Sequence, residues 1–76
     1  MNNPQELRDL ILSALKSMNI NTSKMLSDLG FSQSLIIDMK RYNSMPSADK
    51  LGAIAQYLNL STDYLLGLTD KPEINK

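Results

Sequence analysis

Apolar residues recur along the first part of the chain with the period of an amphipathic α-helix. The positions i, i+3, i+4, i+7, i+8 and i+11 share one helix face, and they hold Leu7, Leu10, Ile11, Ala14, Leu15 and Met18. Asn3 can cap this helix, and Pro4 suits its first position because proline has no N–H to leave unpaired. Glu6 completes a capping box. The pattern predicts a helix over residues 4 to 18.

Start and stop signals mark three further helices. Asn21 is placed to cap a helix over about residues 22 to 29, and Gly30 can take the left-handed conformation that ends it. Ser47 starts a helix whose apolar residues keep the same spacing, at Leu51, Ile54, Ala55 and Leu58. The segment STDYLLG predicts a short last helix that Gly67 closes.

Another helix lies between these, directly after the turn at Gly30. Ser32 is placed to cap it, and Phe31 before the cap can pack on Ile36 as a hydrophobic staple. It ends at the loop YNSMP, because the residue before Pro46 is disfavoured in helical conformation. With no strand pattern of period two, the sequence predicts an all-α fold of five helices.

This third helix carries more apolar residues than one face can hold. Leu35, Ile36 and Ile37 span about 200° of the helix, so they cannot all face one core. Leu35 and Ile36 lie four and three residues before Met39, and these three form the natural inward set. The opposite face then carries Gln33, Ser34, Ile37, Asp38 and Arg41.

Length and composition narrow the class of protein. A chain of 76 residues is one small domain, here residues 1–70, with a polar tail over 71–76 that we expect to fray or to extend along a neighbour. Cysteine and histidine are absent, and neither a catalytic triad nor a glycine-rich phosphate loop can be assembled. We therefore expect no enzyme activity, no metal site and no cofactor.

Apolar runs are three or four residues long at most, and the segment MNNPQELRD has neither a basic region nor an apolar signal core. We expect a cytoplasmic protein without membrane contact. The net charge is zero, which removes the usual electrostatic sign of a nucleic-acid partner. Residues 22–43 nevertheless hold one more cation than anion, and residues 44–76 hold one fewer.

A short turn followed by a helix with an outward polar face is the geometry that admits a helix to the major groove of DNA. The sequence also resembles the helix-turn-helix domain of the phage Cro and lambda-repressor type, the XRE family, from about residue 7 to residue 70. The matching residues are Leu29-Gly30-Phe31-Ser32 at the turn, Ile36, Met39 and the segment MPSADKLGAIAQYLNLSTDYLLGLTD. The resemblance implies a five-helix, lambda-repressor-like fold and a sequence-specific transcriptional regulator, a repressor, of a bacterium or its phage.

The resemblance also assigns the residues that contact DNA. The third helix becomes the recognition helix, with base-edge positions at Gln33, Ser34, Ile37 and Asp38 and backbone positions at Lys40, Arg41, Tyr42 and Asn43. The start of the second helix and the turn complete the set with Thr22, Ser23, Lys24 and Ser32. Two positions depart from the family. Thr22 stands where a glutamine commonly touches phosphate, and Leu26 stands where alanine is common, which implies a wider helix crossing or a local repacking.

Each base-edge position has an alternative interpretation. Gln33 can bond adenine in a bidentate way or be an ordinary solvated side chain, and Ser34 can contact DNA or simply lie on the helix surface. Ile37 can pack on a thymine methyl or be partly buried in the core. Asp38 can accept from cytosine N4 or pair with Arg41 or Lys24, and we favour the pairing, since phosphates repel a free carboxylate.

One copy offers few cations, so we expect a homodimer on double-stranded DNA. Its two-fold symmetry selects a palindromic operator with half-sites about 34 Å apart. The predicted dimer surface consists of Tyr64, Leu65, Leu68 and Ile74. We expect no small-molecule ligand. The alternative function is a protein-protein interaction module, antirepressor-like or antitoxin-like, which keeps the fold and uses Ile37, Leu35 and Met39 as an apolar patch.

Overall fold

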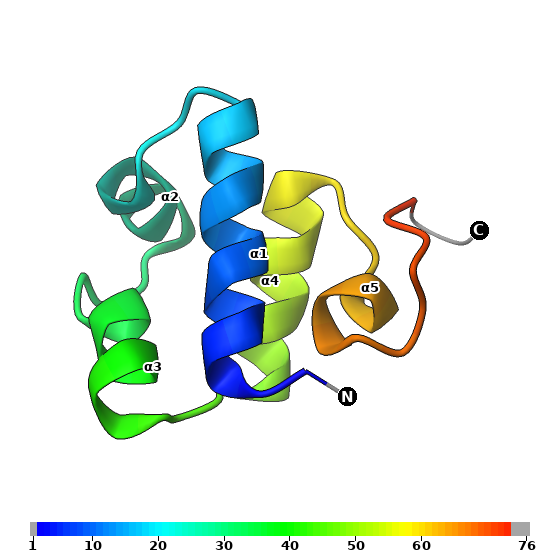
Figure 1. Cartoon of the computed structure of the whole chain (residues 1–76). Helices are drawn as coiled ribbons and strands as arrows, with labels where there is room; N and C mark the ends of the chain where they lie inside the picture. The colour runs from blue at the N-terminus through cyan, green and yellow to red at the C-terminus, as the bar shows by residue number, and fades with distance from the viewer. Residues whose placement is uncertain (1, 74–76) are drawn as a thin grey trace.

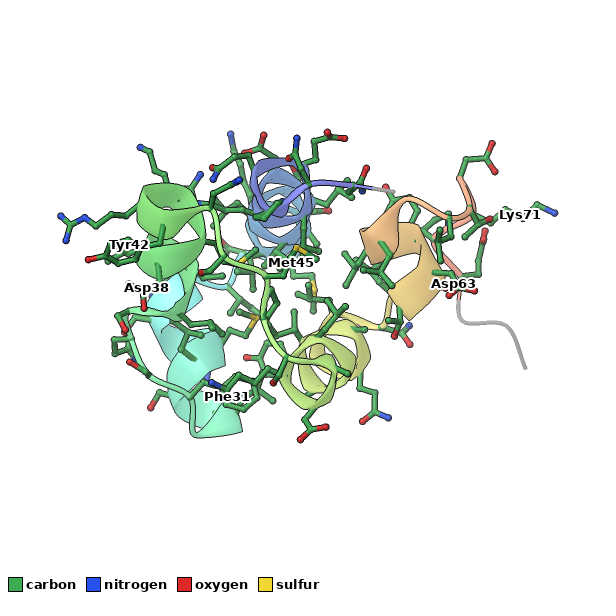
Figure 2. All side chains as sticks on the ribbon, turned by 90° about the horizontal axis from the view of Figure 1, so that it is seen from below. Phe31, Asp38, Tyr42, Met45, Asp63 and Lys71 are labelled. Carbon is green, nitrogen blue, oxygen red and sulfur yellow. The ribbon has the colours of Figure 1, made fainter. Side chains whose placement is uncertain are left out.

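The computed structural model describes residues 2–73, and these form α-helices and loops without any strand (Figure 1). The helices are α1 (Pro4–Ser17), α2 (Thr22–Leu29), α3 (Leu35–Tyr42), α4 (Ala48–Leu58) and α5 (Thr62–Leu66). The predicted all-α, five-helix fold is thus confirmed. α1 and α4 lie side by side at the centre, with α2 and α3 on one side of them and α5 on the other (Figures 1 and 2).

Polar side chains start three of the helices, two of them as predicted. Asn3 Oδ1 accepts from the Glu6 N–H at 2.9 Å, and Asn21 Oδ1 accepts from the Lys24 N–H at 2.7 Å. Ser61 Oγ does the same at the start of α5. These bonds satisfy N–H groups that have no partner within the helix.

The third helix begins later than predicted. Ser32 does not cap it: the Ser32 hydroxyl accepts from the Ser34 N–H at 3.2 Å, and its carbonyl accepts from the Leu35 N–H at 3.1 Å. Ser32 therefore forms a separate turn, and the regular α-helix starts only at Leu35. The physical reason is that a serine hydroxyl can bond the backbone two residues further on as readily as it can cap a helix.

The core is filled by aliphatic and methionine side chains from every helix. Ile36 and Met39 of α3 are buried, and Leu35 packs partly buried against the same core, so the predicted inward set is confirmed. The buried core residues are Leu7, Ile11, Leu15, Met25, Leu26, Ile36, Met39, Leu51, Ile54, Ala55, Leu58 and Leu65.

Two polar contacts attach α2 and α3 to the central helices. The Gln5 side chain of α1 donates from Nε2 to the Met39 carbonyl at 2.7 Å, near the end of α3. On the other side of the pair, the Tyr57 hydroxyl of α4 donates to Asp28 Oδ2 of α2 at 2.7 Å. Polar contacts with the two central helices thus add to the apolar packing that orients α2 and α3.

The two ends of the described chain both contact α5. The Asn2 N–H donates to the Leu66 carbonyl at 2.6 Å, and Asn2 Nδ2 donates to the Leu65 carbonyl at 3.1 Å. Gly67 ends α5 with φ +79°, next to Asn2. In the tail, the Pro72 carbonyl accepts from the Ser61 N–H at 2.9 Å, so this part of the tail extends along its neighbour.

Candidate nucleic-acid interface

α3 and the residues that flank it turn a polar face away from the core. We call this the outer face, and it comprises Gln33, Ser34, Ile37, Asp38, Lys40, Arg41, Tyr42 and Asn43. Ile37 is 58% exposed on it, which confirms that Ile37 is the aliphatic residue left outside. Tyr42 is 67% exposed, and Asp38 is half-buried. Figure 2 shows Asp38 and Tyr42 on the side of α3 that faces away from α1.

The turn before α3 is tied to the start of α2. Gln33 Nε2 donates to the Ser23 carbonyl at 3.3 Å, and the hydroxyls of Ser32 and Ser34 lie 2.8 Å apart. The structure thus brings Ser23 and the turn together. Within the described residues the Gln33 Oε1 accepts no hydrogen bond, so the side chain presents an acceptor to solvent.

At the start of α2 the hydroxyls are available but the cation is engaged. Thr22 is half-buried and Ser23 is exposed. Lys24 Nζ donates to Asp28 Oδ2 at 3.2 Å, one helical turn further along α2. Lys40 and Arg41 are exposed and have no ion pair in the part of the chain that the structure describes. The free positive charge of the site therefore lies at the end of α3.

The ion pair that we favoured for Asp38 is not formed. Among the described residues the Asp38 carboxylate has no cation within 4 Å and accepts no hydrogen bond. Only its backbone carbonyl is engaged, by the Ser44 hydroxyl at 3.3 Å. Of the two cations named for this pairing, Lys24 is engaged instead by Asp28, four residues along α2, and Arg41 forms no ion pair with the described residues.

Electrostatics strengthen the link between α2 and α4. The hydrogen bond from Tyr57, followed by the one from Lys24, lowers the pKa of Asp28 below its ordinary value. The same bond raises the pKa of Tyr57, because it favours the protonated phenol. At neutral pH Asp28 is therefore ionised and Tyr57 is protonated, which is the state in which the bond is strongest.

The predicted dimer surface is only partly available. Leu65 is fully buried at 0% exposure, so its assignment to a dimer surface was wrong. Its side chain anchors the short α5 to the core of its own domain. Leu68 is 61% exposed and Tyr64 is half-buried, whereas Ile74 lies outside the described residues.

The apolar patch of the alternative function is not formed either. Met39 is 1% exposed and Leu35 is half-buried, which leaves Ile37 as the one exposed member of the three. Of the described helices, none has the length and apolar character needed to cross a membrane. Nor do residues 2–73 contain a group of three or more carboxylate side chains arranged to hold a metal ion.

Two residues that position the site were missed from the sequence. Gln5 contacts Met39 across 34 residues, and Tyr57 contacts Asp28 across 29. No local spacing links residues so far apart, so only the fold reveals these contacts. The proximity of Lys24 and Asp28 did have a signal, the i, i+4 spacing of opposite charges on one helix.

Comparisons of the chain with protein-family models, with curated proteins and with solved structures found no match.

Proposed function

We propose that the chain is a sequence-specific DNA-binding regulator, a repressor of the helix-turn-helix XRE type, and that α3 enters the major groove. The observation that carries the proposal is the division of α3 into a buried face and a polar outer face behind a short turn. Ile36 and Met39 hold the helix on the core, and the residues between and beside them are free to meet a partner. No part of the outer face is needed to fill the core.

The dimensions of the helix suit this partner. α3 has eight residues, so it is about 12 Å long, and the major groove of B-DNA is about 12 Å wide. Lys40 and Arg41 follow directly after the base-edge positions, where they can neutralise phosphates at the side of the groove. Their place at the end of α3 also complements the helix dipole.

The small number of free cations supports a dimer. Two unpaired cations per outer face attract DNA only weakly, so affinity must come from two half-sites. A two-fold dimer would select a palindromic operator with half-sites about 34 Å apart. With Leu65 buried, exposed Leu68 and half-buried Tyr64 are the described residues that remain for this contact. A regulator of this kind acts in the cytoplasm.

The decisive experiment is selection of bound sequences from a random double-stranded DNA pool. We expect one palindromic motif to be enriched, and we expect Arg41→Ala to weaken binding about equally for all sequences, because a phosphate contact carries no sequence information. Lys16→Ala is the matched control, since Lys16 is an exposed cation on α1. If no sequence is enriched and Arg41→Ala binds DNA as the unchanged chain does, the proposal is wrong.

The alternative, a protein-interaction module, lacks the observation that it needs. Its three-residue patch is reduced to Ile37. It would gain support only from a chain that selects no DNA sequence and whose Ile37→Ser variant loses a protein partner.

A further inference from the structure

The base-edge positions of the outer face, Gln33, Ser34, Ile37 and Asp38, present one apolar side chain, one carboxylate and no cation. One N–H of the Gln33 amide donates to the Ser23 carbonyl, so this side chain is partly engaged by α2. Ile37 is apolar and 58% exposed. The Asp38 carboxylate accepts only, and none of the described residues neutralises it or donates to it.

Base edges in the major groove respond differently to such a surface. The donors there are the amino groups of cytosine (N4) and adenine (N6), whereas guanine N7 and O6, adenine N7 and thymine O4 are acceptors. A carboxylate has two acceptor oxygens, so on adenine one oxygen would meet N6 while the other meets the repelling N7. On cytosine the neighbour of N4 is a C–H group. Cytosine is therefore the base that satisfies a free carboxylate.

We infer that Asp38 is a specificity-determining residue that selects cytosine, by accepting a hydrogen bond from its N4 amino group, while Ile37 packs on the methyl group of a neighbouring thymine. This inference rests on the proposed DNA-binding function and names the bases that it recognises. The absent ion pair is the observation that carries it. A carboxylate paired with Lys24 or Arg41 would have its acceptors occupied, whereas the free one has both oxygens available.

The charge of Asp38 would also disfavour DNA sequences that lack cytosine at this position. On DNA without cytosine at this position, the Asp38 carboxylate faces at least one base acceptor as well as nearby phosphates, and both repel it. Asp38 thus weakens binding to all other sequences. This gives a protein with few free cations a way to gain selectivity by unfavourable contacts with wrong sites.

The test repeats the selection from a random DNA pool with the unchanged chain, with Asp38→Ala and with Asp38→Asn. The unchanged chain should require cytosine at one position of each half-site and bind the motif with any other base there about tenfold more weakly. Asp38→Ala should lose the preference at this position alone and bind random DNA more tightly. Asp38→Asn should shift the preference to adenine, since an amide can donate to N7 and accept from N6.

Controls separate this effect from a general change of charge or fold. Asp9→Ala removes the same charge from an exposed site on α1 and should leave the motif unchanged. Both Asp38 variants should unfold near the temperature of the unchanged chain, because the carboxylate makes no hydrogen bond to the described residues. Replacing thymine by uracil in the selected motif should weaken binding of the unchanged chain but not of Ile37→Ala.

The outcomes distinguish this inference from the proposed function. If Asp38→Ala keeps the full motif and strengthens binding to all sequences equally, Asp38 is only a solvated charge, and the inference fails while DNA recognition stands. A motif without cytosine in the half-site overturns it in the same way. If the unchanged chain enriches no motif, the proposed function itself fails.

Discussion

Replacing Gly67 by alanine should destabilise the domain more than any other glycine-to-alanine change at a helix end. Gly67 ends α5 with φ +79°, in the left-handed region that alanine adopts only with strain. An added Cβ would also lie 2.6 Å from Asn2 Oδ1 and 2.9 Å from the Asn2 nitrogen. Asn2 would have to move, and it would then lose its bonds to the Leu65 and Leu66 carbonyls.

The size of the loss follows from these two effects. The left-handed conformation costs alanine about 1 kcal/mol. Each of the two hydrogen bonds of Asn2 contributes about 1 kcal/mol, so the free energy of unfolding should fall by about 3 kcal/mol. A domain of this size is stable by only about 4 to 11 kcal/mol. The melting temperature should therefore drop by about 15 °C.

Gly30→Ala is the matched control. Gly30 ends α2 with φ +72°, but no heavy atom lies within 4 Å of an added Cβ. It should lose only the conformational part, about 1 kcal/mol. Urea denaturation followed by circular dichroism measures both variants. Because the backbone effect is common to them, the difference of about 2 kcal/mol reports the Asn2 contact. Equal losses in the two variants would show that Asn2 does not hold α5.

Three further predictions concern charge, pH and burial. For a dimer, the two free cations of each outer face predict that a plot of log Kobs against log[salt] has a slope of about −4, since each neutralised phosphate contributes about −0.9. Arg41→Ala should reduce the size of this slope by about 2. A slope near −10 in a salt titration would contradict this prediction. Tyr57→Phe should remove the main cause of the lowered pKa of Asp28. The lowered pKa of Asp28 stabilises the folded state above the unfolded pKa of about 4, and the raised pKa of Tyr57 stabilises it below the unfolded pKa of about 10. The unchanged chain should therefore be more stable than this variant between about pH 4 and pH 10 and lose the advantage on either side. Unfolding measured at varied pH tests this. Ile36→Ala should cost about 2 to 5 kcal/mol of stability, whereas Ile37→Ser should change it by less than about 0.5 kcal/mol; similar losses in urea denaturation would contradict the assigned faces.

Most of the fold could be predicted because its signals are local. The caps at Asn3 and Asn21 and the left-handed ends at Gly30 and Gly67 depend on residues within one turn of each helix end. The start of α3 could not be predicted in the same way. Ser32 can cap a helix or close a turn, and the choice is made together with the contact of Gln33 to α2, which is ten residues away.

In the candidate site, too, the features set by local sequence could be predicted and those set by distant contacts could not. Which residues of α3 face outward follows from helical geometry, so the exposure of Ile37 could be predicted from its neighbours. The state of Asp38 could not be predicted, because the sequence does not show whether Lys24 pairs with Asp28 or with Asp38. The burial of Leu65 could not be predicted either, because it depends on how α5 packs on the core.

Under the proposed function, folding and DNA recognition use different residues of the same helix, and this makes each testable without the other. Ile36 and Met39 fix where α3 lies, and the amide of Gln5 holds its end by the Met39 carbonyl at 2.7 Å, with a longer contact to Asn43 Oδ1 at 3.4 Å. A change at Asp38 or Ile37 should therefore alter the chemistry of the outer face while the helix stays in place. An altered base preference in such a variant can then be assigned to the side chain itself, whereas a change at Gln5 would mix orientation with contact.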